Sequence, residues 1–354
     1  MKTLEALRRQ SHAPQRVRLF DDASADGSVE RIRQRHPEVE VVVQDPPAGM
    51  PSVGRSRGIA EARCPLVLLL DHDVALEPDA IAEMVAVMAD RPGVAAVGPR
   101  LLFDRRPGAD AEAPDTIYLD RSTLHFLGVS AGGARGVEVD ARARSAGHVA
   151  PVRSLLGGNM MVRTEVARGL GGFDTGYRFG WGEDAELTVR MQLAGWETLV
   201  VPSALGRHEH RPRGLARGEA QFYNRLRLLA TIPARRTQLA LLPAWAALEV
   251  ALAATGLHRG CTRLQARAWR GFLGDRRAIA QRRREIQATR NVSDRDLFDA
   301  RPLAREVKRR DARGLRGAVL KGVDVAASSY WRVAGLVVPA ARRDCQQYAV
   351  SGER

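Results

Sequence analysis

The stretch PLVLLLDHDVALEPD, residues 65–79, places two acids, Asp71 and Asp73, directly after an unbroken run of aliphatic residues. Such a run is too apolar for a surface loop and predicts a buried strand. Pro78 and Asp79 then begin a helical pattern, as the first turn of a helix prefers. A strand that ends in acids and leads into a helix is typical of an α/β sheet, in which ligands bind beyond the carboxyl ends of the strands.

Strands and helical patterns alternate through the front part of the chain. Short β-branched or leucine-rich runs predict strands at RVRLF (16–20), VEVVV (39–43), PLVLLL (65–70), GVAAVGPRLL (93–102) and LVVP (199–202). Helical patterns lie between them at SVERIRQRH (28–36), VGRSRGIAEA (53–62) and PDAIAEMVAVMAD (78–90). The alternation predicts a Rossmann-like, mixed and mostly parallel sheet with flanking helices.

Charge divides the chain into two parts. The 354 residues carry 55 Lys and Arg against 41 Asp and Glu, whereas residues 211–354 alone carry 30 against 12. The front is therefore mildly acidic and the back strongly basic. The three cysteines, Cys64, Cys261 and Cys345, form no CxxC pair, which argues against a disulfide framework or a zinc site and favours a reducing, cytoplasmic setting. The charged opening MKTLEALRRQ lacks the apolar segment of a signal peptide.

The two acids at the strand end have several readings. Asp71 and Asp73 can hold a divalent cation that binds phosphate oxygens and neutralises a departing diphosphate. Taken alone, acids at a strand end more often begin a turn or cap a helix. The nucleophilic aspartate of haloacid-dehalogenase-type phosphatases normally follows the first strand of its domain, whereas here three strand-like runs reach or precede the pair. Later motifs decide among these alternatives.

Several further motifs occur in a fixed order along the chain. They are FDDASADGS (20–28), GRSRGIAEA (54–62), LLLDHDVALEPD (68–79), GGNMMVR (157–163), GWGEDAELTVRMQLAGW (180–196) and a histidine just past LVVP. Together they resemble the inverting nucleotide-sugar glycosyltransferases of family 2, which have the GT-A fold. The resemblance covers about residues 1–230.

The resemblance implies a donor site and a metal site. Asp21 and Asp22 match the acidic pair that contacts the base or ribose of the nucleotide, and Arg55 matches a basic position near the diphosphate. Asp71 and Asp73 match the metal-binding DxD, in which Asp73 is the direct ligand and Asp71 serves both donor and metal. The implied cofactor is Mg²⁺ or Mn²⁺.

His208 matches a histidine that is often near the metal or the diphosphate. A lone histidine after a strand is more often a surface residue, and imidazole is a soft ligand for a hard cation. His208 is therefore a weaker metal candidate than Asp73, and His210 is weaker still.

The resemblance also implies an acceptor pocket and a general base. Gly157, Gly158 and Asn159 match the turn that lines the sugar and acceptor pocket, and Trp181 between two glycines suits a ring-shaped ligand.

Glu183 and Asp184 match the ED pair, whose aspartate is the general base of a single displacement. The helical pattern over 183–195 places Asp184 in a first turn, where the helix dipole favours an ionised carboxylate. The alternative is that both residues are ordinary first-turn acids.

One part of the family pattern is not present. Members usually begin with a strand and a PTYN-like turn, but LEALRRQ at the start of this sequence matches the helix that follows that turn. The first strand would lie beside the strand at residues 65–70, so its absence would leave two inner edges of the sheet without ladder partners. We expect the true start to lie upstream.

The back of the chain, residues 215–354, is expected to be a basic helical region that follows a catalytic domain at 1–214. Its apolar run over 238–257 contains Pro243 and Glu249. Twenty residues can just span a bilayer of about 30 Å. The charge favours a helix lying in the interface, and an ordinary buried helix is the alternative.

A basic helical pattern over 263–298 ends near Asn291. No stacking aromatics are interleaved with its arginines, so anionic lipid is a more economical partner than nucleic acid.

These observations predict an enzyme at the cytoplasmic face of the cell membrane that moves a sugar from a nucleotide-sugar donor to a lipid-linked or cell-surface glycan. The alternative is a non-catalytic protein, either a sugar-nucleotide-binding relic or a membrane-recruited scaffold.

Overall fold

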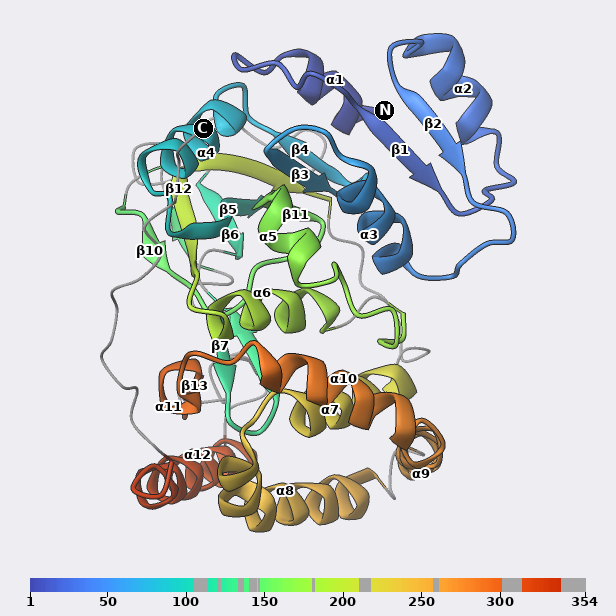
Figure 1. Cartoon of the computed structure of the whole chain (residues 1–354). Coiled ribbons are helices and arrows are strands. Elements are labelled where there is room, and N and C mark those ends of the chain that lie inside the picture. Colours follow the sequence, from blue (N-terminus) through green and yellow to red (C-terminus); the bar gives the residue numbers. More distant parts are fainter. Residues whose placement is uncertain are drawn as a thin grey trace.

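A computed structural model of the chain shows a β-sheet with flanking helices at one end and a group of helices at the other (Figure 1). It describes residues 1–104, 114–119, 122–132, 137–139, 145, 147–179, 182–209, 218–256, 261–300 and 314–338.

The main sheet has the strand order β10-β12-β5-β11-β3. These strands are β3 (Leu66–Leu70), β5 (Val94–Phe103), β10 (Ala150–Pro151), β11 (Asn159–Arg163) and β12 (Glu197–His208). β11 is antiparallel to both β3 and β5, and β12 is parallel to β5, so β3, β5 and β12 all run in one direction. The predicted mixed α/β class is confirmed.

Short strands extend this sheet and form a second one. β4 (Val74–Leu76) pairs with the end of β12, β6 (Asp115–Leu119) pairs with β5, and β9 (Glu138–Val139) pairs with β6. A separate three-stranded sheet contains β7 (Ser122–His125), β8 (Val129–Gly132) and β13 (Phe298–Asp299). The sequence analysis predicts none of these strands, because each is too short to show a period.

The predicted helices of the front part form with small changes at their ends. They are α1 (Lys2–Arg8), which is expected from LEALRRQ, and α2 (Ser28–Arg35), α3 (Pro51–Glu61), α4 (Ala80–Asp90) and α6 (Glu183–Leu193); the structure adds α5 (Thr164–Gly169). α4 covers one face of the sheet, where Met84 packs with Val97. α6 covers the other, where Leu187 packs with Ala96. A sheet covered on both faces explains why β5 is buried along all but its last residue.

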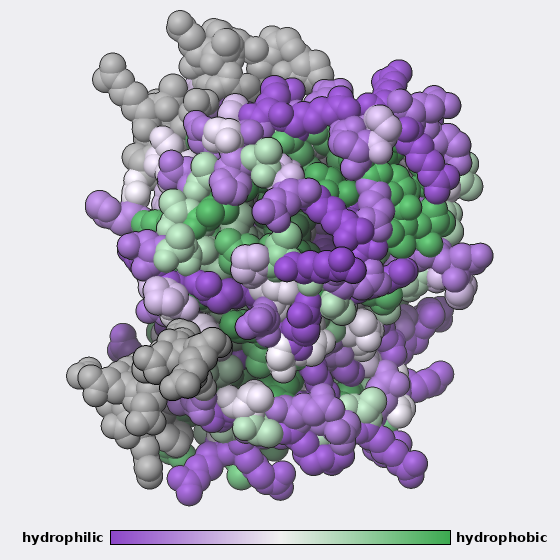
Figure 2. All heavy atoms as spheres, turned by 45° about the horizontal axis from the view of Figure 1, so that its top comes forward, coloured by the Kyte–Doolittle hydropathy of each residue, from purple (hydrophilic) through white to green (hydrophobic). Residues whose placement is uncertain are grey.

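The sheet is divided between β3 and β1 (Arg18–Asp21). β1 pairs in parallel with β2 (Glu40–Val43) to form a separate two-stranded sheet, and β3 pairs with β11. In the described part of the chain, each of β1 and β3 therefore has one edge without a ladder partner, as the sequence analysis expects. Figure 2, which turns this end of the molecule forward, shows apolar patches open among hydrophilic side chains.

In the described residues after β12, six helices follow. They are α7 (Gly218–Thr231), α8 (Arg235–Gly256), α9 (Cys261–Gly274), α10 (Arg276–Ala288), α11 (Asp294–Leu297) and α12 (Gly314–Ala334). The prediction of a single basic helix over 263–298 is wrong, because the structure has two helices, α9 and α10, separated at Gly274 and Asp275. At this break the Asp275 carboxylate turns toward the protein and accepts hydrogen bonds from Tyr223 and Arg178.

Candidate active site

The candidate site forms where three elements meet. β3 ends at Leu70, β11 begins at Asn159 directly opposite it, and α6 begins at Glu183. Asp71 donates its backbone N–H to the Gly158 carbonyl at 2.6 Å, which continues the ladder one residue past β3. The antiparallel pairing of β3 and β11 therefore places the glycine turn beside the first acid of the DxD.

Arg55 of α3 links two of the predicted site carboxylates. Its Nη2 donates to Oδ1 of Asp71 at 2.6 Å, and its Nη1 donates to Oε1 of Glu183 at 3.2 Å. Burial works to lower the pKa of Arg55, but the charges of Asp71, Glu183 and Asp184 outweigh it and raise that pKa. The guanidinium is thus a fixed positive charge between the strand end and the first turn of α6.

Asp184 is held in place by backbone donors. Its Oδ2 accepts the Gly157 N–H at 3.2 Å, and its Oδ1 accepts the Ala185 N–H at 2.7 Å. Burial raises the pKa of Asp184, and these two hydrogen bonds and Arg55 oppose the rise without cancelling it. A carboxylate with a raised pKa has the basicity that a general base requires.

Glu183 precedes Asp184 and is buried. Burial raises the pKa of Glu183 to about 8, and the Asp184 charge adds to the rise while Arg55 opposes it. The two neighbouring carboxyls therefore titrate as a pair, and near neutral pH they hold a proton between them.

Gly157 and Gly158 are required for close packing. A Cβ at Gly158 would lie 1.9 Å from Cγ of Asp71, and a Cβ at Gly157 would lie 2.8 Å from Nη1 of Arg55 and 3.0 Å from Cβ of Asp184. Any larger residue at either position must displace the charged groups. The pair brings Asp71 and Asp184 to opposite sides of one turn.

Asn159 and Trp181 complete the predicted pocket residues. Asn159 is buried, and its side-chain oxygen accepts no hydrogen bond from the described residues. Asn159 follows Gly158 directly, so its side-chain oxygen lies beside the glycine turn and can accept a hydrogen bond from a ligand. Trp181 lies outside the described residues, as do Gly180 and His210.

Asp73 and His208 form a second group near the site. Nε2 of His208 lies 3.5 Å from Oδ1 of Asp73, and the ladder between β4 and β12 holds them there because Val74 pairs with His208. Burial works to raise the pKa of Asp73, but the hydrogen bond and charge of His208 outweigh it, so this pKa lies below its ordinary value. Tyr118 packs on the imidazole with ring centres 4.3 Å apart.

Asp73 and His208 fit a divalent cation in part. Oδ1 of Asp73 is buried and faces the His208 imidazole at 3.5 Å, and carboxylate oxygen is a preferred ligand of such ions. Asp71, by contrast, is paired with Arg55. No group of three or more His, Cys, Asp or Glu side chains in the described ranges is arranged to hold a metal. Phosphate oxygens or water would have to complete the coordination.

Asp21 and Asp22 lie at the carboxyl end of β1. Asp22 accepts the N–H groups of Ala48 and Gly49 at 2.6 and 2.7 Å, and Asp21 accepts that of Ser24 at 2.9 Å. Asp21 therefore fixes its own loop, and Asp22 fixes the loop that follows β2. α3, which carries Arg55, packs closely on β1, because Gly54 of α3 lies against Phe20 of β1 with no room for a side chain.

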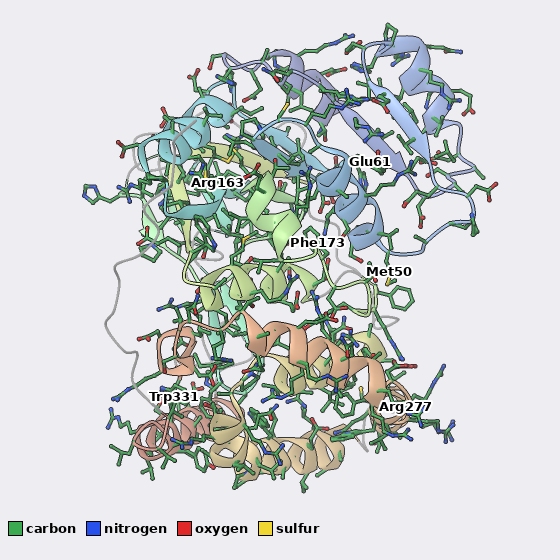
Figure 3. All side chains as sticks on the ribbon, in the orientation of Figure 1. Met50, Glu61, Arg163, Phe173, Arg277 and Trp331 are labelled. Carbon is green, nitrogen blue, oxygen red and sulfur yellow. The ribbon has the colours of Figure 1, made fainter. Side chains whose placement is uncertain are left out.

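The sequence does not predict the role of Phe173, whose ring packs under the Arg55 guanidinium. Arg55 lies over its ring at 5.8 Å, and Ser56 of α3 accepts its N–H at 3.0 Å (labelled in Figure 3). The signal available was the Gly-Gly-Phe-Asp sequence at 171–174, ahead of the ED pair. Its role is visible only once α3 is placed beside α6.

A buried ionic network joins this loop to the back of the chain. Asp174 accepts two hydrogen bonds from Arg227 of α7, at 2.8 and 2.9 Å. Glu186 of α6 pairs with Arg190 at 2.7 Å and with Arg282 of α10 at 3.4 Å. Helices α7 and α10 thus fix both the loop before α6 and α6 itself.

The arrangement can accept a proton next to a positively charged surface. Asp184 is a partly buried carboxylate at a helix start with a raised pKa, and Arg55 with the neighbouring turn can receive an anionic group. Asp73 and His208 offer a metal-binding position on the other side of the DxD.

Comparisons with known proteins agree with this geometry. A family model described as "Glycosyltransferase like family 2" matches residues 1–227. The "Uncharacterized protein y4gI" of Sinorhizobium fredii is 34% identical over 96 residues, which are 26% of this chain and 10% of that protein. The chain thus spans about a tenth of that relative's length.

A solved structure shares the fold. GalNAc-T7, in a structure with UDP, GalNAc and Mn²⁺, matches with a TM-score of 0.52 at 18% identity, over 69% of this chain and 48% of that one. Staphylococcus aureus TarS 1–349 gives a TM-score of 0.49 at 14% identity, over 94% and 87%. The chain spans about half the length of GalNAc-T7, and that likeness shows the fold alone.

Proposed function

Because the chain belongs to glycosyltransferase-like family 2, we propose that it transfers a sugar from a nucleotide-sugar donor to an acceptor hydroxyl in a single, inverting displacement. The observation that supports this most is Asp184, a partly buried carboxylate at the start of α6 that accepts the Gly157 N–H and whose pKa is raised. It lies in the group of charged residues that contains Arg55 and Asp71.

The proposed chemistry needs one base and one leaving group. Asp184 takes the proton of the acceptor hydroxyl as its oxygen attacks the anomeric carbon of the donor sugar. The bond between that carbon and the diphosphate breaks, and the diphosphate leaves with the bonding electrons. No carboxylate nucleophile is needed, in contrast to retaining glycosidases.

The donor side is proposed to use the charges around the glycine turn. Arg55 is placed to pair with the diphosphate in exchange for Asp71, and Asp21 and Asp22 are placed at a strand end suited to the nucleoside. UDP is present in the GalNAc-T7 structure, which makes a uridine nucleotide the first donor to test.

A divalent cation, Mg²⁺ or Mn²⁺, is part of the proposal. Asp73 and His208 would hold it, and when bound it would neutralise the departing diphosphate. Mn²⁺ is named with the GalNAc-T7 structure. Asp71 would take part only after Arg55 releases it.

The acceptor is proposed to be a lipid-linked or cell-surface glycan, reached from the cytoplasmic face of the membrane. The turn at Gly157, Gly158 and Asn159 would line its pocket with Trp181 and Glu183. A pocket beside a carboxylate base suits a hydroxyl acceptor of this kind.

A non-catalytic sugar-nucleotide-binding protein is the second candidate. The unpaired edges of β1 and β3 favour it, because an incomplete sheet can bind a nucleotide without aligning it for transfer. Binding alone therefore does not separate the two candidates.

A panel of nucleotide sugars, tested with Mn²⁺ and with EDTA, separates them. We expect one donor to raise the unfolding temperature and to be hydrolysed or transferred, with both effects lost reversibly in EDTA. Protection without any turnover supports the binding protein. Full turnover in EDTA contradicts the role given to the cation.

A further inference from the structure

α8 and α12 lie at the end of the molecule farthest from the main sheet (Figure 1). Both helices expose large aliphatic side chains. On α8 and α12 the described residues most exposed are Leu239 (63%), Leu242 (58%), Val250 (69%), Val325 (67%) and Val333 (68%). Aliphatic residues concentrated on adjoining helices indicate an interaction surface more strongly than scattered ones do.

The outer face of α8 is free of charge along most of its length. Its exposed residues recur every three or four positions: Arg235, Arg236, Leu239, Leu242, Pro243, Ala246, Ala247, Val250, Ala251 and Ala254. After the two arginines, every member is apolar. Among the described helices, α8 is the one long and apolar enough to cross a membrane.

The one acid of this apolar run faces the protein. Glu249 pairs with Arg225 of α7, and it accepts hydrogen bonds from Gln265 at 2.7 Å and Trp269 at 2.8 Å. Trp245 donates to the Phe126 carbonyl at 2.9 Å. These contacts hold the inner face of α8 against the body, which favours a helix lying on a membrane over one that crosses it.

α12 has the same two-sided character. Its outer face carries Val325, Ser329 and Val333, and Lys321 and Arg332 are exposed on the same helix. Trp331, labelled in Figure 3, faces the body and stacks on Phe126 at 5.3 Å. The Tyr330 hydroxyl donates to the Ala240 carbonyl of α8 at 2.5 Å, so the two helices are tied together.

Exposed charge around these helices is strongly one-sided. Among the described residues from α8 to α12, the exposed bases are Arg235, Arg236, Arg263, Arg267, Arg270, Arg276, Arg277, Arg284, Arg295, Lys321 and Arg332. The exposed acids there are Glu285 and Asp296. An apolar surface with basic surroundings has both features that peripheral binding to an anionic bilayer requires.

We propose that the outer faces of α8 and α12, which we call the apolar platform, lie in the headgroup region of an anionic lipid bilayer. Leu239, Leu242, Val250, Val325 and Val333 enter the boundary between headgroups and acyl chains, while the arginines contact lipid phosphates. This attachment does not depend on the chemistry at Asp184.

Vesicle flotation with the full chain tests the platform. The probes are phosphatidylcholine vesicles with and without 30 mol% phosphatidylglycerol, a composition on the order of natural anionic surfaces. The test variant is Leu239→Glu with Val250→Glu and Val333→Glu. The control is Val43→Glu, an exposed valine of β2 at the opposite end of the molecule.

We expect the parent and the control to float with anionic vesicles, and the triple variant to bind at least tenfold less while keeping its circular dichroism and its binding of the soluble donor. High salt should release part of the parent, and alkaline carbonate should release all of it. A folded triple variant that floats like the parent overturns the proposal. Resistance to carbonate shows a spanning helix and overturns it too. A parent that ignores vesicles but loses self-association in the triple variant shows an interface between copies instead.

Discussion

Gly158 controls how closely Asp71 can approach the turn before β11. Arg55, Asp71, Glu183 and Asp184 come from separate parts of the chain, and two glycines without Cβ atoms allow them to pack around one point. The sequence predicts which residues take part. It does not predict the Arg55–Asp71 pair, because the pairing of β3 with β11 decides it.

Gly158→Ala should therefore damage the site. Its Cβ would lie 1.9 Å from the Asp71 carboxyl, so Asp71 must move and its contact with Arg55 must break. We expect a loss of about 1–3 kcal/mol in the free energy of unfolding, as in overpacked cores, together with loss of donor binding. Gly93→Ala is the control, since a Cβ there meets nothing within 4 Å. Equal donor affinity in the two variants would show that the close approach is unimportant.

The raised pKa of Glu183 predicts how stability depends on pH. Its folded pKa of about 8 lies above its ordinary value of 4.5, so the folded protein holds a proton that the unfolded chain has released. The free energy of unfolding should consequently fall as pH rises from about 5 to 8. In Glu183→Gln this fall should be smaller by about 1 kcal/mol or more, since one pKa unit corresponds to about 1.4 kcal/mol. Urea unfolding at pH 5 and pH 8.5 measures both slopes, and identical slopes contradict the assignment.

At the scale of elements, the predictable parts are those with a clear period or a long apolar run. β3, β5, α4 and α6 were predicted within a few residues, because each packs a regular pattern against the core. α12 and the short strands β4, β6 and β9 were not predicted. Their residues pair through contacts distant in the chain, which no local pattern encodes.

Because β1 and β3 do not pair with each other, we expect the amides on their open edges to be less protected than those of β5. In these two strands, amides on the unpaired edge have no ladder partner in the described chain, whereas β5 has neighbours on both sides. We expect alternate amides of residues 18–21 and 66–70 to exchange with deuterium at least tenfold faster than those of β5. Hydrogen exchange followed by mass spectrometry measures this. Equal protection in β3 and β5 would show that the edge of β3 is covered.

At the scale of the whole molecule, the helices at the back contact the elements that carry the candidate site. The sequence analysis ends the catalytic domain at residue 214, but Arg227 and Arg282 lie beyond that boundary and reach Asp174 and Glu186 beside α6. Composition and charge reveal that the back of the chain is basic and helical. They do not reveal which arginines are buried, because burial depends on how α7 and α10 pack.

Removing one partner of this buried network should be costly. Arg227→Met removes the two hydrogen bonds that Arg227 donates to the buried Asp174. Breaking such a pair costs about 3–5 kcal/mol, less whatever the contacts of Asp174 with Gly176 and Arg282 compensate. Arg267→Met changes an exposed arginine and should alter stability by about 1 kcal/mol or less. Thermal and urea unfolding compare the two variants. Similar small losses in both would show that the back helices do not support the site.

The central claim is that Asp184 is the base of a glycosyl transfer, and single-turnover transfer by Asp184→Asn tests it most directly. Asparagine keeps the size of the side chain but cannot accept the hydroxyl proton. We predict that turnover falls by about 100-fold or more while donor affinity changes by less than about threefold. Glu165→Gln, an exposed acid of α5, should match the parent in both measurements. Parental turnover in Asp184→Asn, or loss of donor affinity in place of turnover, would contradict the assignment of Asp184 as the base.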